Sequence, residues 1–276
     1  MEFIYFLKTV VLGIVEGLTE FLPVSSTGHL ILAGHFLDFN GPEADTFYIA
    51  IQAGAIVAVC WHYRVRIVRI LQNLFRRGPD QRLAVNTVVA FIPAAVLGVL
   101  LSSIIKERFF NIFTVATALV VGGVIILWIE HYNKKRSIPP RVATMDDMTW
   151  KDALGVGLMQ CFALIPGTSR SGATIIGALV LGLSRTAATE FSFFLAIPTI
   201  FGATVYDLYK SREILSADNL PGIGVGFVVS FLSAIVVVRW LLRYVSKNDF
   251  CIFGWYRIVF GLFILGLWAA GLAHIF

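Results

Sequence analysis

The chain has 276 residues, of which 58% are hydrophobic and 14% charged, and its mean hydropathy is +0.82. Soluble domains carry about 45–50% apolar and about 25% charged residues, so the composition excludes one large water-soluble core. It also excludes a disordered chain, because 23 Phe, 8 Tyr and 6 Trp residues require burial. Six spans of about 20 residues would use roughly 120 residues. We therefore predict an all-α polytopic membrane protein with six transmembrane helices.

Residues 3–37 form the first apolar segment, and it is interrupted near its middle. The interruption runs from Pro23 to His29 and reads PVSSTGH. Each remaining half is about 10–14 residues long, which is too short for a full span and typical of a re-entrant segment. Residues 3–37 are therefore predicted to form a re-entrant broken-helix hairpin.

Charge-free stretches predict the six spanning helices and leave one more broken segment between the third and the fourth. The second broken segment, residues 153–183, is interrupted from Pro166 to Gly172 with the sequence PGTSRSG, and it predicts a second re-entrant hairpin. The predicted spans are residues 47–61, 85–105, 112–129, 191–206, 222–238 and 258–273.

The two halves of the chain correspond at a single ungapped offset of 144 residues. The offset aligns Gly13 with Gly157, Glu16 with Gln160, Ser25 with Ser169, Gly28 with Gly172, and Phe47 with Phe191. We predict one membrane domain, residues 1–276, made of two repeats at 1–131 and 152–276, each a hairpin followed by three spans. Three is an odd number, so the repeats would have inverted topology.

Basic residues predict the orientation in the membrane. Residues 64–84 hold six arginines against one acid, and the segments 131–152 and 239–247 add further Lys and Arg on the same side of the six-span arrangement. The positive-inside rule assigns this side to the cytoplasm and both termini to the outside. This pattern also accounts for the net charge of +5, so we expect no nucleic-acid partner.

Apart from Lys8 near the start of the first, the predicted hairpins contain three charged residues, Glu16, Glu20 and Arg170, and His29 is nearby. Each charge would cost about 2.5–3.5 kcal/mol if it faced lipid, so these side chains must face a polar cavity or one another. Glu16 and Glu20 are four residues apart and share one helix face. Paired carboxylates repel unless a proton or a cation lies between them, and the pair predicts a Mg²⁺ or Ca²⁺ site.

The two interruptions carry different chemistry. The second combines backbone donors at glycines, hydroxyls and one guanidinium, which together favour a phosphate or pyrophosphate. The first offers hydroxyls as nucleophile candidates and an imidazole, at His29, for proton transfer. The candidate substrate-binding residues are Ser25, Thr27, Gly167, Ser169, Arg170, Ser171 and Thr174.

Both motifs resemble signatures of one family. The run EGLTEFLPVSSTGH, residues 16–29, resembles the glutamate-rich signature of bacterial undecaprenyl-pyrophosphate phosphatases of the bacitracin-resistance type, and PGTSRSGAT, residues 166–174, resembles their second signature. The resemblance implies an inner-membrane phosphatase that hydrolyses undecaprenyl pyrophosphate to undecaprenyl phosphate and inorganic phosphate. This reaction would recycle the lipid carrier for peptidoglycan synthesis and give bacitracin resistance. The resemblance also implies divalent-metal dependence and an active site facing the periplasm.

Residue by residue, the resemblance implies that Glu16 and Glu20 bind metal or transfer protons. Ser26 and His29 would be the nucleophile and proton-transfer candidates, and Arg170 would clamp the pyrophosphate, assisted by Ser169, Ser171 and Thr174. The sequence leaves open whether Ser26, His29 or a metal-bound water attacks. It also leaves open the preferred metal, the prenyl chain length, and the oligomeric state, for which a homodimer is one option.

Two alternatives remain. Membrane lipid phosphatases of the acid-phosphatase superfamily share a Ser-Gly-His element similar to Thr27-Gly28-His29, but the chain lacks their Lys-x6-Arg-Pro element. A lipid-phosphate transporter or flippase would also use inverted repeats with broken helices. Such a transporter would need its site exposed to both faces in turn, whereas an enzyme hydrolyses pyrophosphate without a gradient.

Overall fold

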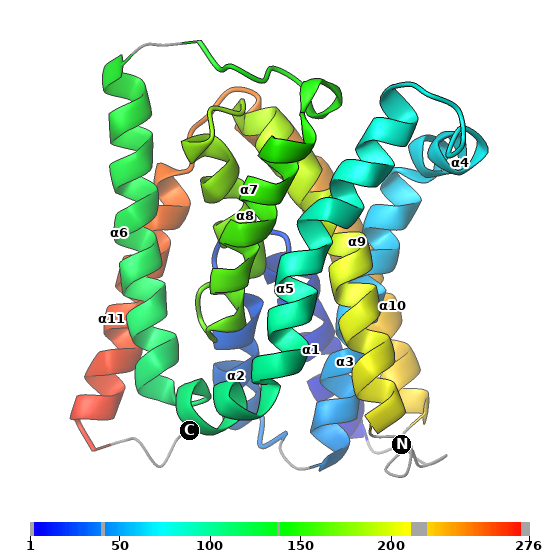
Figure 1. Ribbon diagram of the computed structural model, residues 1–276. Coiled ribbons are helices and arrows are strands. Elements are labelled where there is room, and N and C mark those ends of the chain that lie inside the picture. Colours follow the sequence, from blue (N-terminus) through cyan, green and yellow to red (C-terminus); the bar gives the residue numbers. More distant parts are fainter. Residues whose placement is uncertain (1–2, 40–41, 137–138, 211–219, 272–276) are drawn as a thin grey trace.

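The computed structural model describes residues 3–39, 42–136, 139–210 and 220–271 (Figure 1). The described residues are almost entirely helical, and among them Val142 and Leu183 form an isolated β-bridge. The predicted all-α fold is therefore confirmed. The long helices are α3 (Pro42–His62), α5 (Pro79–Phe109), α6 (Ile112–Arg136), α9 (Arg185–Lys210), α10 (Leu220–Val245) and α11 (Cys251–Ala269).

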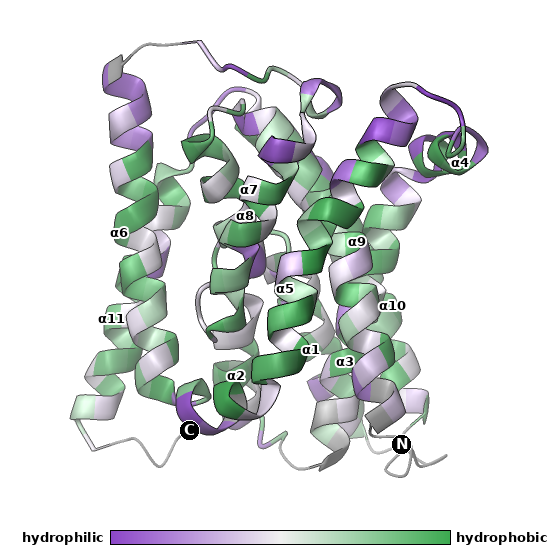
Figure 2. Ribbon diagram, viewed as in Figure 1, coloured by the Kyte–Doolittle hydropathy of each residue, from purple (hydrophilic) through white to green (hydrophobic). Residues whose placement is uncertain are grey.

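Five of these helices, α5, α6, α9, α10 and α11, are long and apolar enough to cross a membrane. A sixth candidate is α3 together with α4 (Arg64–Gln72), which meet at a 73° bend. The predicted multi-pass membrane architecture is therefore confirmed. Figure 2 shows that hydrophilic residues gather at the end of the molecule that carries α4 and the loop before α7 (Trp150–Gln160).

The helices extend beyond the predicted spans because charged and polar residues continue them past the apolar stretch. The sixth is displaced toward the N-terminus: the predicted span is 258–273, whereas the helix runs from Cys251 to Ala269. Residues 272 and 273 of that prediction lie outside the described part of the chain. Because the helix starts early, it contains Arg257. The prediction begins the span next to this residue, since it counts only charge-free stretches as spans.

Both predicted hairpins are broken helices. The first consists of α1 (Phe3–Thr19) and α2 (Ser26–Phe36); the second consists of α7, a 3₁₀ turn η2 (Cys161–Leu164), and α8 (Arg170–Val180). The breaks end earlier than the sequence predicts, so residues 26–29 and 170–172 begin helices instead of forming loops. Their backbone N–H groups therefore point toward the break, as at any helix N-terminus.

The two breaks have the same local geometry. α2 and α8 are both 11 residues long, and each follows a serine in the left-handed region, Ser25 with φ 71° and Ser169 with φ 72°. Few non-glycine residues adopt this conformation, and those that do often lie at functional sites. In Figure 1, α1 and α2 occupy the end of the molecule where α11 ends, whereas α7 and α8 extend from the end that carries α4.

The orientation of this bundle can be tested with single cysteines. Gly78 and Asn111 are both exposed and lie at opposite ends of α5. Because the positive-inside rule assigns the arginine-rich end to the cytoplasm, a cysteine at Asn111 should react with an impermeant maleimide in intact cells, and one at Gly78 should not. The native thiols Cys60, Cys161 and Cys251 give the background labelling. Labelling at Gly78 before lysis would contradict the predicted orientation.

Candidate active site

The end of α1 carries the two glutamates. The backbone N–H of Glu20 donates to the carbonyl of Glu16 at 2.9 Å, so the helical turn continues beyond Thr19. Both residues are buried, at 1% and 6% exposure. Neither carboxylate oxygen of Glu16 has a hydrogen-bond partner among the described residues. An ionised carboxylate in this state is costly, so Glu16 requires a proton or a cation.

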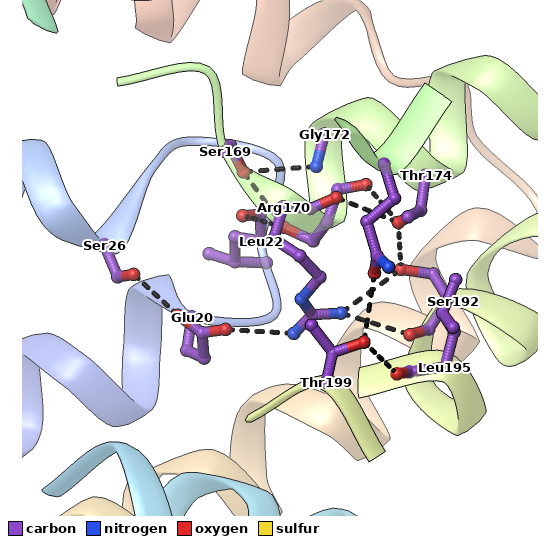
Figure 3. Close-up of polar contacts among 12 residues, drawn as sticks. Glu20, Leu22, Ser26, Ser169, Arg170, Gly172, Thr174, Ser192, Leu195 and Thr199 are labelled. Carbon is purple, nitrogen blue, oxygen red and sulfur yellow. Dashed lines mark hydrogen bonds and ion pairs between the residues drawn. The ribbon is translucent and has the colours of Figure 1, made fainter. Parts of the chain in front are cut away.

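Glu20 joins the two hairpins (Figure 3). Its Oε2 accepts a hydrogen bond from Ser26 Oγ at 2.6 Å, and its Oε1 accepts one from Arg170 Nη2 at 2.9 Å. The structure thus brings together three predicted site residues from segments 150 positions apart in the chain. An ion pair this deeply buried is held by additional hydrogen bonds, because desolvation of both charges would otherwise outweigh their attraction.

Arg170 is held from α9. Its Nη1 donates to the carbonyl of Ser192 at 3.1 Å, and the Ser192 hydroxyl in turn bonds Thr174 Oγ1 at 2.6 Å (Figure 3). The Nε–H of Arg170 has no partner among the described residues. Ser171 Oγ donates to the carbonyl of Leu22 at 2.8 Å, which adds a second link between the hairpins. The guanidinium is therefore fixed in place through Nη1 and Nη2.

His29 lies apart from this cluster. Its Nδ1 donates to the carbonyl of Ser25 at 2.8 Å, and its Nε2 lies 2.6 Å from the hydroxyl of Tyr256. A carbonyl only accepts, so in the neutral ring Nδ1 carries the hydrogen and Nε2 accepts from Tyr256. The ring also stacks on Phe260, with 4.4 Å between centroids. The structure therefore places His29 against α11, where it supports the strained Ser25 peptide.

A cavity of about 550 Å³ opens beside the cluster, within the usual size of a ligand site. Its wall is polar at the hairpin breaks and mostly apolar along α5 and α9, where small residues predominate. The predicted site residues that line it are Glu20, Ser25, Ser26, Thr27, Gly167, Ser169 and Arg170. Glu16, His29, Ser171 and Thr174 are not among the lining residues; the last two are fully buried and bonded within the protein.

The glutamates fit a divalent cation better than a zinc-type site. Among the described residues no group of three or more His, Cys, Asp or Glu side chains could hold a metal. Mg²⁺ in phosphoryl-transfer sites, however, is usually bound by one or two carboxylates and the phosphates of the substrate, with water completing the shell. The two unpartnered oxygens of Glu16, next to Glu20, match this donor set.

Arg257 is a site residue that the sequence prediction missed. It is 1% exposed and uses all five guanidinium N–H groups, each directed at a backbone carbonyl. Nε contacts Leu119 at 3.3 Å, Nη1 contacts Pro23 and Thr168 at 3.2 and 2.9 Å, and Nη2 contacts Ala118 and Gly167 at 3.0 and 3.1 Å. It therefore fastens both hairpin breaks to α6.

Gly167 shows how closely the second break packs on α6. Its φ is +91°, and a Cβ there would lie 2.4 Å from the carbonyl oxygen of Val115. Only glycine meets both demands, the positive φ and the close approach.

The signal for Arg257 was present in the sequence, because it is the only Asp, Glu, Lys or Arg after Asp249. It has the same isolated character that singled out Arg170.

Comparison with known proteins gives consistent matches. The family model for the bacitracin resistance protein BacA matches residues 9–263. A protein named undecaprenyl-diphosphatase from Janthinobacterium sp. (strain Marseille) is 58% identical over 265 residues, covering 96% of each chain. The undecaprenyl-diphosphatase of Cupriavidus metallidurans is 57% identical over 281 residues, covering 96% of each chain. Undecaprenyl-diphosphatase 2 of Rhodospirillum rubrum is 55% identical over 273 residues, covering 99% of this chain and 98% of its own.

Loss of Arg257 should destabilise the protein. Arg257→Met removes the donors of three carbonyls in the hairpin breaks, and each buried carbonyl left without a donor costs about 1–3 kcal/mol. We expect a clearly lower melting temperature in detergent, and a smaller decrease for Arg257→Lys, which keeps the charge and part of the donors. Arg243→Met, at an exposed position near the end of α10, is the control and should melt like the wild type. Wild-type melting of Arg257→Met would contradict the fastening role.

Proposed function

Because the chain belongs to the family of the bacitracin resistance protein BacA, we propose that it is an undecaprenyl-diphosphatase. It hydrolyses undecaprenyl pyrophosphate to undecaprenyl phosphate and inorganic phosphate, which recycles the lipid carrier for peptidoglycan synthesis and gives bacitracin resistance. The observation that carries the proposal is the buried Ser26–Glu20–Arg170 arrangement, which pairs a hydroxyl with a carboxylate and an anion-binding guanidinium beside one cavity.

The cavity has the two-sided character that a lipid diphosphate requires. Arg170 and the hairpin breaks supply the donors for the diphosphate, while α5 and α9 supply an apolar wall for the first part of the prenyl chain. That wall includes Phe91, Ala94, Gly98 and Ala203. A soluble phosphate ester would not need such a wall, so its presence supports a prenyl substrate.

Of the three nucleophile candidates, Ser26 has the most favourable position. It lines the cavity, and its hydroxyl lies 2.6 Å from Glu20 Oε2, within hydrogen-bond reach of a base. In this proposal Oγ of Ser26 bonds to the terminal phosphorus, its proton moves to Glu20, and the anhydride P–O bond breaks to release undecaprenyl phosphate. Water then hydrolyses the phosphoserine, releasing inorganic phosphate. His29 would act by holding the Ser25 peptide that precedes the nucleophile.

Glu16 and Glu20 would hold the divalent cation, Mg²⁺ or Ca²⁺, together with phosphate oxygens of the substrate. When bound, the cation would neutralise the phosphate charge and polarise the phosphoryl group. Arg170 lies next to this pair, with Nη2 bonded to Glu20, and its unpartnered Nε–H is available for a phosphate oxygen.

We also propose that residues 1–131 and 152–276 are inverted repeats in a bacterial inner membrane, with the cavity open to the periplasm. The matching serine conformations and equal lengths of α2 and α8 support the repeat. The arginine-rich end, opposite the end of α1 and α2, supports the orientation. In this orientation the diphosphate would bind on the side where peptidoglycan is polymerised.

Arg170 gives the first test of the activity. Removal of one charged donor of this type costs roughly 10²–10³ in rate, so Arg170→Ala should lose at least that much phosphate release from a prenyl pyrophosphate in detergent. Arg170→Lys should stay severely impaired, because lysine keeps the charge but lacks the fork. Arg69→Ala removes an arginine that is 52% exposed and paired with Asp80, and it should change little.

The same assay separates the enzyme from a transporter. Purified wild-type protein in detergent has no gradient to use, so phosphate release there is hydrolysis. Near-normal rates for Arg170→Ala would refute the clamp, and absence of any release by the wild-type protein would refute the proposed function.

Glu16 gives a test of the metal. Glu16→Gln keeps the shape but weakens a carboxylate ligand, so the Mg²⁺ concentration for half-maximal activity should rise by at least about 10-fold, the lower end of what disruption around a metal site costs. The melting temperature should be maintained, and a chelator should abolish wild-type activity. Glu107→Gln, at an exposed position, is the matched control. An unchanged metal requirement in Glu16→Gln would exclude Glu16 as a ligand.

A further inference from the structure

Gln160, the last residue of α7, is a buried amide with one half unused. It is 1% exposed and lines the same cavity as Glu20, Ser26 and Arg170. Its Oε1 accepts a hydrogen bond from Thr199 Oγ1 at 3.3 Å, whereas its Nε2 has no partner among the described residues. A buried N–H group without an acceptor is unfavourable, and such groups in native proteins usually have a specific explanation. An acceptor that enters the cavity would satisfy it.

Gln160 and Arg170 line the same cavity and are both held by residues of α9. Ser192 holds the guanidinium and Thr199 holds the amide, and these two residues are seven apart on α9. Residues at this spacing lie on one helix face, about 10 Å apart along the axis. Thr199 Oγ1 also lies 2.7 Å from the carbonyl of Leu195, so its single hydrogen is shared between that carbonyl and Oε1 of Gln160 (Figure 3). Two donors thus approach one cavity from one supporting helix.

The offset of 144 gives Gln160 a counterpart of nearly the same shape and opposite chemistry. It corresponds to Glu16, whose carboxylate can only accept hydrogen bonds, while the amide Nε2 of Gln160 donates. A carboxylate at both positions would set negative charge on both sides of an anionic headgroup. The amide keeps the second hairpin free of acidic groups at this site, and it adds a neutral donor beside Arg170.

We propose that Gln160 is a substrate-binding residue, whose Nε2–H donates to a phosphate oxygen of the prenyl diphosphate that Arg170 leaves free. Thr199 orients the amide by occupying Oε1. This inference rests on the proposed function, because the ligand is the diphosphate headgroup.

The test compares substitutions that keep the size of the side chain. Gln160→Met has no donor and suits an apolar environment, so it should fold. Loss of a hydrogen bond to a charged group should lower kcat/KM for a C15 prenyl diphosphate about 10- to 100-fold, mainly through KM. Gln160→Glu should lose more, because it places an acceptor against the phosphate. Gln72→Met, at the exposed end of α4, is the matched control and should behave like the wild type.

A swap variant separates the donor role from a requirement for one carboxylate at either position. Glu16→Gln combined with Gln160→Glu restores the number of carboxylates, yet it should remain as inactive as the more impaired single variant. Activity of Gln160→Met within about twofold of an active wild type, with unchanged melting, would overturn the inference, as would recovery in the swap variant. An inactive wild type would instead refute the proposed function itself, so the two failures are distinguishable.

Discussion

The structure depends on satisfying two broken helices inside an apolar bundle. Each break leaves backbone carbonyls that lipid cannot solvate. Arg257 meets this requirement for both breaks at once, because its guanidinium donates to Pro23, Gly167 and Thr168 and to two carbonyls of α6. A buried guanidinium is itself costly, and full use of its five donors is what makes it tolerable. The same side chain, Arg257, therefore both stabilises the fold and fixes the geometry of the two breaks that form the site.

With the breaks fixed, the protein divides its chemistry between the hairpins. The first supplies acceptors and a hydroxyl, in Glu16, Glu20 and Ser26; the second supplies donors, in Arg170 and Gln160. The ion pair between Glu20 and Arg170, at 2.9 Å, joins the acceptors of the first hairpin to the donors of the second. A site assembled this way presents donors to the anionic part of a ligand from one side, and acceptors for a cation or a proton from the other. Two hairpins of identical sequence would lack this polarity.

The sequence predicted the site residues that carry a charge inside an apolar segment. Glu16, Glu20 and Arg170 were found because each is expensive in lipid. Arg257 was missed because it lies at the edge of a charge-free stretch, where a charge is interpreted as the end of a span. Gln160 carried no such signal, since a neutral amide hardly changes hydropathy.

The separation of His29 from the cavity could not have been predicted either. Ser26 and His29 both lie in the predicted break, so the sequence analysis grouped them as the nucleophile and proton-transfer candidates. The structure instead ends the break at Ser25, and the helix that starts at Ser26 directs the His29 ring toward Tyr256 on α11. The side chain that meets Ser26 comes from the preceding turn, Glu20. The start of one helix, which follows the positive φ of Ser25, thus decides which side chain lies within hydrogen-bond reach of Ser26.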